Sequence, residues 1–237
     1  MQFAEWVLSS ITEEPQFLST LMFSDESNFY LNGHVNKQNC RIWASENPRR
    51  FSEQPLHSEK VIVWAAMSHR GVLGPFFFEE SVNGENYLEM LQSFLWPQVA
   101  NLPDIDRLRF MQDGAPPHFA RPVRQWLDQV FEGRWIGRRG PTEWPPRSPD
   151  MTPLDFYLWG HIKQLVYQRR PQNTDDLRGF IRDAFSDINA QPELMRKVLL
   201  AFKHRMHLIM ENGGNHIEQL QDRDLATPQE QAGAIDE

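Results

Sequence analysis

The stretch LRFMQDGAPPH, residues 108–118, places an acidic residue where an apolar segment meets a proline-rich turn. Leu108 to Gln112 is interpreted as a short strand, and residues 114–117 end it, because proline has no N–H to give to a sheet ladder. Asp113 therefore lies at the C-terminal end of this strand, where the chain leaves the sheet. If a neighbouring strand also carries an acid, the two carboxylates can meet at one end of the sheet.

Three more strands are expected upstream of this stretch. Residues 21–31 alternate and end at Asn32-Gly33, a pair that favours a hairpin turn. Residues 61–67 are apolar and predict a buried strand, and residues 72–78 predict another after a short turn. We interpret the three segments as an antiparallel run.

Helical periodicity accounts for most of the remaining chain. Residues 135–136 indicate a short fifth strand, whereas the segment 133–147 is rich in Gly, Pro and Arg and is expected to be an exposed, flexible loop. The order of strands and helices predicts an α/β fold with a mixed sheet flanked by helices. The expected helices run from Asn83 to near Pro97, from His118 to Phe131, from Pro153 through Val166, from Asp175 to Ile188 and from Pro192 to Met210.

The composition is that of a folded chain without a membrane-spanning run. Of the 237 residues, 40% are hydrophobic and 12% aromatic, which suffices for a core. The densest apolar run, residues 72–78, is interrupted by Gly74-Pro75 and is too short to span a bilayer. Cys40 is the single cysteine, which excludes a disulfide framework and a cysteine zinc site and fits a reducing compartment, cytosol or nucleus.

The charge is unevenly distributed along the chain. The formal net charge of −8 argues against a generic nucleic-acid binder. Residues 121–170 nevertheless contain nine Lys and Arg against five Asp and Glu, whereas residues 218–237 contain six acids and one arginine. A mildly basic middle is thus followed by an acidic tail, with ordinary solvated surface charge as the alternative interpretation.

Three aspartates on separate elements are the candidates for chemistry. Asp25 lies in the apolar stretch 21–25, Asp113 ends the strand described above, and Asp155 lies in the first turn of the helix that begins near Pro153. A carboxylate in an apolar strand is costly unless a cation or proton neutralises it. Carboxylates that bridge two Mg²⁺ or Mn²⁺ ions are the standard machinery for displacement at phosphorus. The three acids therefore suggest a metal-dependent enzyme that cuts phosphodiester bonds.

Each acid also has a simpler interpretation. Asp25 suits a turn before a hairpin, Asp113 an Asx turn, and Asp155 the positive end of a helix dipole. Glu26 and Asp150 compete with them for the site. The side chain of Glu26 is expected on the opposite face of its strand from Asp25, and Asp150 is better interpreted as the acid that shapes the turn or caps the helix.

Three aromatic residues near the acids have open roles. His118 could donate a hydrogen bond to a phosphate or to Asp113, with packing at the start of a helix as the alternative. Trp135 and Trp144 border the expected loop, where they could stack on a flipped base or fill the core. Core packing is the simpler interpretation of the two tryptophans.

Three arginines belong to the same expected loop. Arg138, Arg139 and Arg147 lie within or at the end of residues 133–147 and flank the proposed site. Guanidinium groups on a loop beside a catalytic site are suited to contacts with DNA phosphates. A solvated loop without a ligand is the alternative.

Six segments of the chain resemble the catalytic domain of mariner-like transposases of the Tc/mariner superfamily. The resemblance extends from about Phe17 to Leu220, and its last motifs are long and specific. It implies a ribonuclease H-like fold in which three acids bind two Mg²⁺ ions, or Mn²⁺ in their place. The segments are MFSDESNFYLNGHVN, NCRIWASENPRR, KVIVWAAMSHRGVLGPFFFEE, FMQDGAPPH, GRWIGRRGP and WPPRSPDMTPLDFYLWG.

The resemblance also assigns the three acids and an activity. By motif match, Asp25, Asp113 and Asp155 are the catalytic and metal-binding residues. The 41 residues between Asp113 and Asp155 exceed the gap in the best-known mariner branch, and the extra residues fall within 133–147. The implied activity is hydrolysis of DNA at transposon ends and joining of the 3′-hydroxyl to target DNA, by a homodimer in the nucleus.

The chain departs from the family at its N-terminus. Relatives carry a pair of helix-turn-helix units before the catalytic domain, whereas 24 residues precede Asp25 here. We expect a short N-terminal remnant at 1–16, a catalytic domain at 17–220 and a polar acidic tail at 221–237. The intact acids favour an active enzyme, either a transposase domain or a nuclease without element specificity. The net charge and the missing region favour the alternative, a catalytically silent relic or a host-adopted module that binds nucleic acid or protein.

Overall fold

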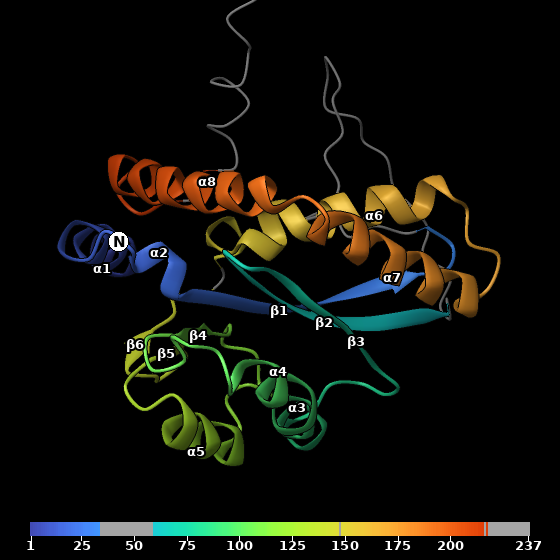
Figure 1. The fold of residues 1–237 in the computed structure, drawn as a ribbon, viewed down its shortest axis with the longest axis horizontal. Coiled ribbons are helices and arrows are strands. Elements are labelled where there is room, and N and C mark those ends of the chain that lie inside the picture. The colour runs from blue at the N-terminus through green and yellow to red at the C-terminus, as the bar shows by residue number, and fades with distance from the viewer. Residues whose placement is uncertain (34–58, 147, 216, 218–237) are drawn as a thin grey trace, which may run out of the picture.

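The protein contains a six-stranded mixed sheet with helices on both faces (Figure 1). Its α/β architecture confirms the fold class predicted from the order of elements. The computed structural model describes residues 1–33, 59–146, 148–215 and 217. The strands are β1 Leu21–Tyr30, β2 Lys60–Ser68, β3 Gly71–Phe78, β4 Arg109–Met111, β5 Trp135–Gly137 and β6 Thr142–Glu143, in the sheet order β3-β2-β1-β4-β5-β6.

The strand β1 lies at the centre and joins two kinds of pairing. It pairs antiparallel with β2 along nearly its whole length. On its other edge it runs parallel to β4, with Phe23 opposite Met111. The strand that carries Asp25 and the strand that leads to Asp113 are therefore direct neighbours, which is the arrangement that brings two carboxylates to one end of a sheet.

Two layers of helices bury the two faces of the sheet. Side chains alternate along a strand, so Phe23 of β1 enters one core and Met22 enters the other. None of the helices in the described part of the chain is long and apolar enough to cross a membrane. One layer, at the top of Figure 1, comprises α1 Gln2–Glu13, α6 Trp159–Gln168, α7 Thr174–Asn189 and α8 Pro192–Glu211, and the other comprises α3 Gly84–Met90, α4 Trp96–Val99 and α5 Arg121–Val130.

The helix that begins at Asn83 continues further than its sequence predicts. The side chain of Asn83 caps it by accepting hydrogen bonds from the N–H groups of Glu85 and Asn86. A π-helical turn, Leu91–Leu95, follows α3 and leads into α4, so the helix runs through Pro97 instead of stopping there. Pro97 has no N–H to donate to the preceding turn, and the hydrogen bond that it omits falls at the junction between the π-helical turn and α4.

The described part of the segment 133–147, residues 133–146, is only partly the exposed loop that its composition indicates. Arg138 and Arg139 are exposed, but the short strand expected at 135–136 is present as β5, and a further strand follows it. The two strands β5 and β6 extend the sheet in parallel beyond β4. The side chains of Trp135 and Trp144 are 2% and 4% exposed, so both are core residues and not stacking platforms for a base. A Cβ added to Gly137 or Gly140 would come within 3.0 or 2.7 Å of the Trp135 ring. These glycines therefore permit close packing and do not indicate flexibility.

The core begins before residue 17, where the domain was expected to start. Phe3, Ala4 and Val7 of α1 are buried, and α1 packs against α8. The Phe3 ring lies edge-on to the ring of Trp144, with the centroids 4.9 Å apart. The buried residues of α1 are spaced three and four residues apart, which is typical of an amphipathic helix. The segment 1–16 was too short for this pattern to be recognised from the sequence.

The strands β1 and β2 are not joined by a two-residue turn at Asn32-Gly33. The strand β1 ends at Tyr30, and its antiparallel partner begins only at Lys60. Within the described residues, the antiparallel partner of β1 is therefore not the segment that directly follows Asn32-Gly33. Residues 34–58, which include Cys40 and Trp43, lie outside the described part of the chain.

Candidate active site

Three aspartates line one pocket where β1, the end of β4 and the start of α6 come together. The pocket has a volume of about 360 Å³, and its walls include Asp25, Asp113 and Asp155. Asp25 belongs to β1, Asp113 follows β4, and Asp155 lies in the π-helical turn Leu154–Leu158 that leads into α6. The structure thus brings together the three acids that the sequence singled out.

A hydrogen bond between the two strands fixes the spacing of two of these acids. The hydroxyl of Ser24 donates to the carbonyl oxygen of Met111 over 2.7 Å, and both residues line the pocket. Ser24 directly precedes Asp25, and Met111 lies two residues before Asp113. This hydrogen bond therefore fixes the backbone next to Asp25 relative to the backbone next to Asp113.

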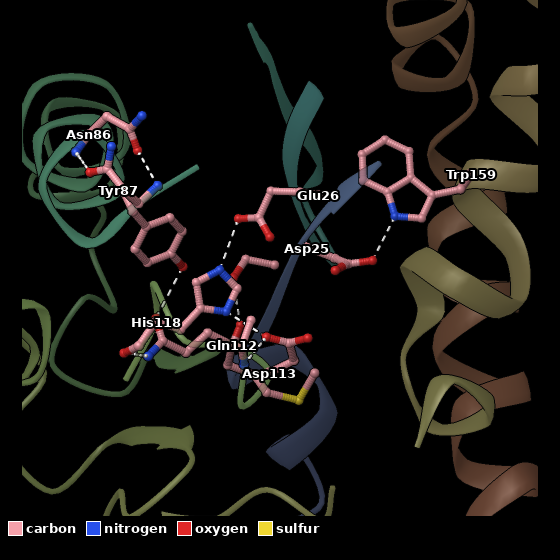
Figure 2. Close-up of polar contacts among 12 residues, drawn as sticks. Asp25, Glu26, Asn86, Tyr87, Gln112, Asp113, His118 and Trp159 are labelled. Atoms are coloured by element: carbon pink, nitrogen blue, oxygen red, sulfur yellow. Dashed lines mark hydrogen bonds and ion pairs between the residues drawn. The ribbon is translucent and has the colours of Figure 1, made fainter. Parts of the chain in front are cut away.

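The environment of Asp25 disfavours the ionised form of its carboxyl group. Its Oδ2 accepts a hydrogen bond of 2.8 Å from the indole N–H of Trp159 (Figure 2). The pKa of Asp25 is nevertheless raised well above its usual range, first because burial removes water from the carboxyl group and then because Asp155, Glu26 and Asp113 are negative neighbours. A cation in the pocket would relieve both causes.

Asp113 has the opposite balance. Its Oδ1 accepts hydrogen bonds from the N–H of Ala115 at 2.8 Å and from Nδ1 of His118 at 2.5 Å. Burial alone would raise the pKa of Asp113, but the hydrogen bond and charge of His118 outweigh it, and the pKa falls below its usual value. Asp113 is therefore ionised at neutral pH and held by one of its two oxygens.

His118 is a buried link between two carboxylates. It is 2% exposed, and its Nε2 lies 3.1 Å from Oε1 of Glu26 while Nδ1 contacts Asp113 (Figure 2). Burial would lower its pKa, but the charges and hydrogen bonds of Glu26 and Asp113 raise it to about 10. Of the two contacts that the sequence left open, the structure has the one with Asp113. The ring is buried among these partners, and α5 begins only at Arg121. A contact of His118 with a DNA phosphate stays a prediction.

Glu26 is the residue whose role sequence reasoning missed. Its side chain does lie on the other face of β1 from Asp25, as the strand alternation predicts, and this face is where His118 packs (Figure 2). Glu26 and His118 are 92 residues apart in sequence, so no local pattern indicates that they meet. The available signal was the acid pair Asp25-Glu26 itself, which supplies a carboxylate to each face.

A second buried base lies on the helical side of the pocket. Lys163 of α6 is 3% exposed, and its Nζ lies 5.4 Å from the centroid of the Phe29 ring. Burial lowers the pKa of Lys163 to about 8, against the opposing effect of Asp155 and Asp25. Lys163 follows Asp155 by eight residues, two helical turns on the same side, and this spacing could have identified it.

Asp150, the competitor for the third acid, serves another purpose. It is 3% exposed and is not among the residues that line the pocket. Its Oδ2 accepts the N–H of Ile217 at 3.1 Å, and its backbone oxygen accepts Nε of Arg205 at 2.6 Å. Asp150 thus fastens α8 and residue 217 to the turn, and it does not cap the following helix.

Three arginines surround a single aromatic ring close to the pocket. The guanidinium carbons of Arg124 and Arg138 lie 4.4 Å from the centroid of the Phe119 ring, and that of Arg139 lies 5.5 Å away. Arg138 also packs on Gly114, which lines the pocket, because a Cβ added there would lie 3.4 Å from Cβ of Arg138. Arg138 is therefore beside the pocket, Arg139 lies against the same aromatic ring, and Arg147 lies outside the described residues.

The acids fit a hard divalent cation by chemistry, although their side chains are not closed around one. Among the described residues, no group of three Asp, Glu, His or Cys side chains is close enough to hold an ion. One oxygen of Asp25 is bonded to Trp159 and one of Asp113 to His118, so neither side chain is turned wholly into the pocket. Oxygen donors and uncompensated negative charge are what Mg²⁺ and Mn²⁺ prefer, but metal ligation stays a prediction.

Comparison with known proteins gives a family and several relatives. The model of the DDE superfamily endonuclease family matches residues 20–178. The Tc3 transposase of Caenorhabditis elegans is 26% identical over 204 residues, which cover 84% of this chain and 58% of that protein. Human histone-lysine N-methyltransferase SETMAR is 28% identical over 149 residues, 60% of this chain and 21% of that protein. The chain thus spans little more than half of the Tc3 transposase.

Solved structures of the Mos1 mariner transposase share the fold. The paired-end complex of Mos1 with Mg superposes with a TM-score of 0.72 at 20% identity, over 92% of this chain and 62% of that one. The isolated Mos1 catalytic domain gives a TM-score of 0.69 at 18% identity, over 92% of this chain and 93% of that one. This likeness confirms the ribonuclease H-like fold. The chain belongs to the DDE superfamily of endonucleases, and its fold is that of the Mos1 mariner catalytic domain.

Proposed function

We propose that this domain cleaves DNA phosphodiester bonds with Mg²⁺ or Mn²⁺ ions held by Asp25, Asp113 and Asp155. The observation that carries the proposal is the shared pocket of the three acids, which come from three different elements. The raised pKa of Asp25 supports it, because burial and the neighbouring carboxylates disfavour the negative charge of Asp25. A bound cation would stabilise that charge. The Mos1 transposase catalytic domain, which shares this fold, has been solved with Mg and with Mn, and this supports the choice of ions.

The protein side chains have separable tasks in this proposal. Two bound ions would activate the attacking hydroxyl and stabilise the leaving oxygen. Trp159 holds Oδ2 of Asp25 through its indole N–H, which orients that carboxylate in the pocket. His118 and the N–H of Ala115 hold Oδ1 of Asp113, so its Oδ2 is the oxygen available to a ligand. Asp155 completes the set from the helical side.

The arginines around Phe119 are the proposed contact with the DNA backbone. Among the described residues, the guanidinium groups of Arg124, Arg138 and Arg139 form no ion pair with a carboxylate. Three like charges gathered on one ring repel one another, and a phosphate would relieve that repulsion. Arg138 and Arg139 keep the role that the sequence predicted, Arg124 joins them, and Arg147 stays an untested candidate.

The wider activity is a proposal that rests on the relatives. We propose that the protein to which this domain belongs acts on transposon ends and target DNA, including strand transfer, as a homodimer in the nucleus. Support comes from the names of the matches, which are transposases and Mos1 complexes described as paired-end and strand-transfer complexes.

Nicking of a supercoiled plasmid tests the cleavage proposal. The chain should nick DNA with Mn²⁺ or Mg²⁺, whereas Asp25→Asn, Asp113→Asn and Asp155→Asn should each lose nicking while the melting temperature shows a folded protein. Asp150→Asn is the matched acid outside the pocket, and it should still nick if it folds. If Asp155→Asn nicks like the parent and a folded Asp150→Asn does not, the third acid is misassigned.

A silent binding module is the second candidate function. The lack of a preformed coordination shell among the described residues favours it. It predicts that the parent binds DNA and does not nick it with any divalent cation, at any protein concentration. Charge reversal at Arg138 and Arg139 should weaken DNA binding in either case and flatten its salt dependence. Arg196→Glu, on the exposed face of α8, is the control.

A further inference from the structure

The carboxylate of Glu26 is connected to the pocket although it does not line it. Its Oε1 lies 3.1 Å from Nε2 of His118, and the other ring nitrogen lies 2.5 Å from Oδ1 of Asp113. Carboxylate oxygens only accept, so both ring nitrogens must carry hydrogen for both bonds to form. Glu26, His118 and Asp113 therefore form one continuous chain of charge-assisted hydrogen bonds across β1 (Figure 2).

The imidazole ring in the middle of this chain has little freedom to rotate. The ring of Tyr87 packs on it with the centroids 4.2 Å apart. The amide of Gln112 donates to the backbone oxygen of His118 at 3.0 Å, and the hydroxyl of Tyr87 donates to the other end of that amide, also at 3.0 Å. Both the face of the His118 ring and the backbone of His118 are therefore held in place.

We propose that Glu26 is a positioning residue which, through His118, decides which oxygen Asp113 presents to a metal ion. His118 and the N–H of Ala115 both occupy Oδ1 of Asp113, which directs Oδ2 into the pocket. Without Glu26, the ring would lose the acceptor that fixes its Nε2 side, and the Asp113 carboxylate would sample other rotamers. The inference rests on the proposed metal-dependent function, in which Asp113 is a ligand.

The simpler interpretation of Glu26 is a buried ion pair that only stabilises the fold. A second simple interpretation is that the negative charge of Glu26 attracts a cation directly, without His118. Both alternatives can be distinguished from positioning by Glu26→Gln, because glutamine keeps an oxygen acceptor for Nε2 of His118 and removes the negative charge. Likewise, asparagine at position 118 ends near the place of Nδ1 and still reaches Asp113, whereas glutamine reaches towards Glu26 instead.

Direct binding of Mn²⁺ to the purified chain, followed by electron paramagnetic resonance, tests the proposal without relying on cleavage. We expect Glu26→Ala and His118→Gln to weaken Mn²⁺ binding about tenfold, as loss of an outer partner of a metal ligand does. Glu26→Gln and His118→Asn should bind nearly as well as the parent. Asn28→Ala, on the exposed part of the same face of β1, is the control and should change nothing.

The double variant Glu26→Ala/His118→Asn decides whether Glu26 acts through the ring. It should bind Mn²⁺ like His118→Asn alone, because the link that transmits Glu26 is already absent. A further loss in the double variant, or equal losses in Glu26→Ala and Glu26→Gln, would show direct attraction and overturn positioning. If Glu26→Ala does not fold, comparing His118→Gln with His118→Asn still tests positioning, and equal Mn²⁺ binding by these two variants would overturn it.

Asp113→Asn separates the failure of this inference from the failure of the proposed function. If Asp113→Asn loses Mn²⁺ binding while Glu26→Ala and His118→Gln keep it, positioning is overturned and the metal site stands. If Asp113→Asn binds Mn²⁺ like the parent, Asp113 is not a ligand, and both proposals fall.

Discussion

The two sides of the acid pocket balance their negative charge in different ways. Beside β4, Asp113 shares a buried imidazole with Glu26, and its pKa lies below the usual value. Beside α6, Asp25 has an indole N–H from Trp159, and its pKa is raised by burial and by neighbouring acids. The same residue type is therefore ionised and oriented on one side and poorly stabilised as an anion on the other. The difference teaches that an added cation matters most to Asp25.

The largest expected effect is a change in the free energy of unfolding with pH, which arises from the titration of His118. Its folded pKa of about 10 exceeds the usual 6.5, so its stabilising contribution is complete below pH 6.5 and is lost as pH rises towards 10. Lys163 has a lowered pKa of about 8, so it opposes this trend above pH 8, where the unfolded chain binds more protons. Urea unfolding between pH 6.5 and 8 should therefore show falling stability.

The variant His118→Asn is the control for this pH dependence. It should lose most of the slope between pH 6.5 and 8, because asparagine does not titrate. A parent whose stability is flat or rises over that range, with metal absent, would contradict the description of His118 as a shared imidazolium.

Divalent cations should produce the next largest effect. A ligand that binds the native state stabilises it by about 2.7 kcal/mol at 100 times its dissociation constant. Mg²⁺ or Mn²⁺ should therefore raise the melting temperature of the parent by several degrees at saturation. Asp25→Asn should lose most of this rise, because it removes the acid that gains most from a cation. A rise that is equal in Asp25→Asn and the parent would remove Asp25 from the proposed ligands.

The fold was largely predictable because its strands have clear local patterns. The apolar runs that became β1, β2 and β3, the short β4 and the short β5 were all identified. The neighbouring positions of β1 and β4 were only a condition for Asp25 and Asp113 to meet, and the structure fulfils it. The segment 133–147 was misinterpreted because composition does not distinguish a glycine that bends a loop from one that lies under a ring. Gly140 packs on Trp135, and that contact exists only in the folded chain.

The site was predictable only in part. Asp25 could be named because it interrupts an apolar strand, and Asp113 and Asp155 because they lie at the end and near the start of an element. All three also match a family motif. The role of Glu26 could not be named, because it depends on which face of β1 meets the chain after β4, and His118 is 92 residues away. Sequence reasoning correctly put Glu26 on the opposite face, and it ranked the residue below Asp25 for that reason.

Neutral substitutions should change the stability of the metal-free protein in opposite directions on the two sides. Asp25→Asn should raise the free energy of unfolding by about 1 kcal/mol, because it removes a buried charge among like charges. Asp113→Asn should lower it by about 1 kcal/mol, because it weakens the bond to a charged ring; the Asp113 side chain is 49% exposed, so solvent screens part of that loss. Urea unfolding at pH 7 with a chelator measures both.

Stability changes of the same sign in Asp25→Asn and Asp113→Asn would contradict the difference between the two sides of the pocket. If both substitutions stabilise the protein, His118 does not compensate Asp113, and the two acids belong to one repulsive cluster. If both destabilise it, Asp25 is better balanced than its raised pKa indicates. Asp128→Asn, which keeps an acceptor for the indole N–H of Trp135 outside the pocket, controls for the loss of a carboxylate elsewhere.

The smallest effect is expected at Lys163, the buried base on the α6 side. Methionine has a similar shape and lacks the charge, so Lys163→Met removes both the cost of burying an ammonium group and its attraction to Asp155 and Asp25. These two changes oppose each other, and the free energy of unfolding without metal should shift by less than about 1 kcal/mol. The rise in melting temperature with Mg²⁺ should instead become larger, because the acids then have no neighbouring ammonium group to reduce their repulsion. Lys197→Met, on the exposed side of α8, should leave that rise unchanged. A smaller rise in Lys163→Met would mean that Lys163 helps to arrange the acids for the ion, and the two sides of the pocket would then each depend on a buried base for position.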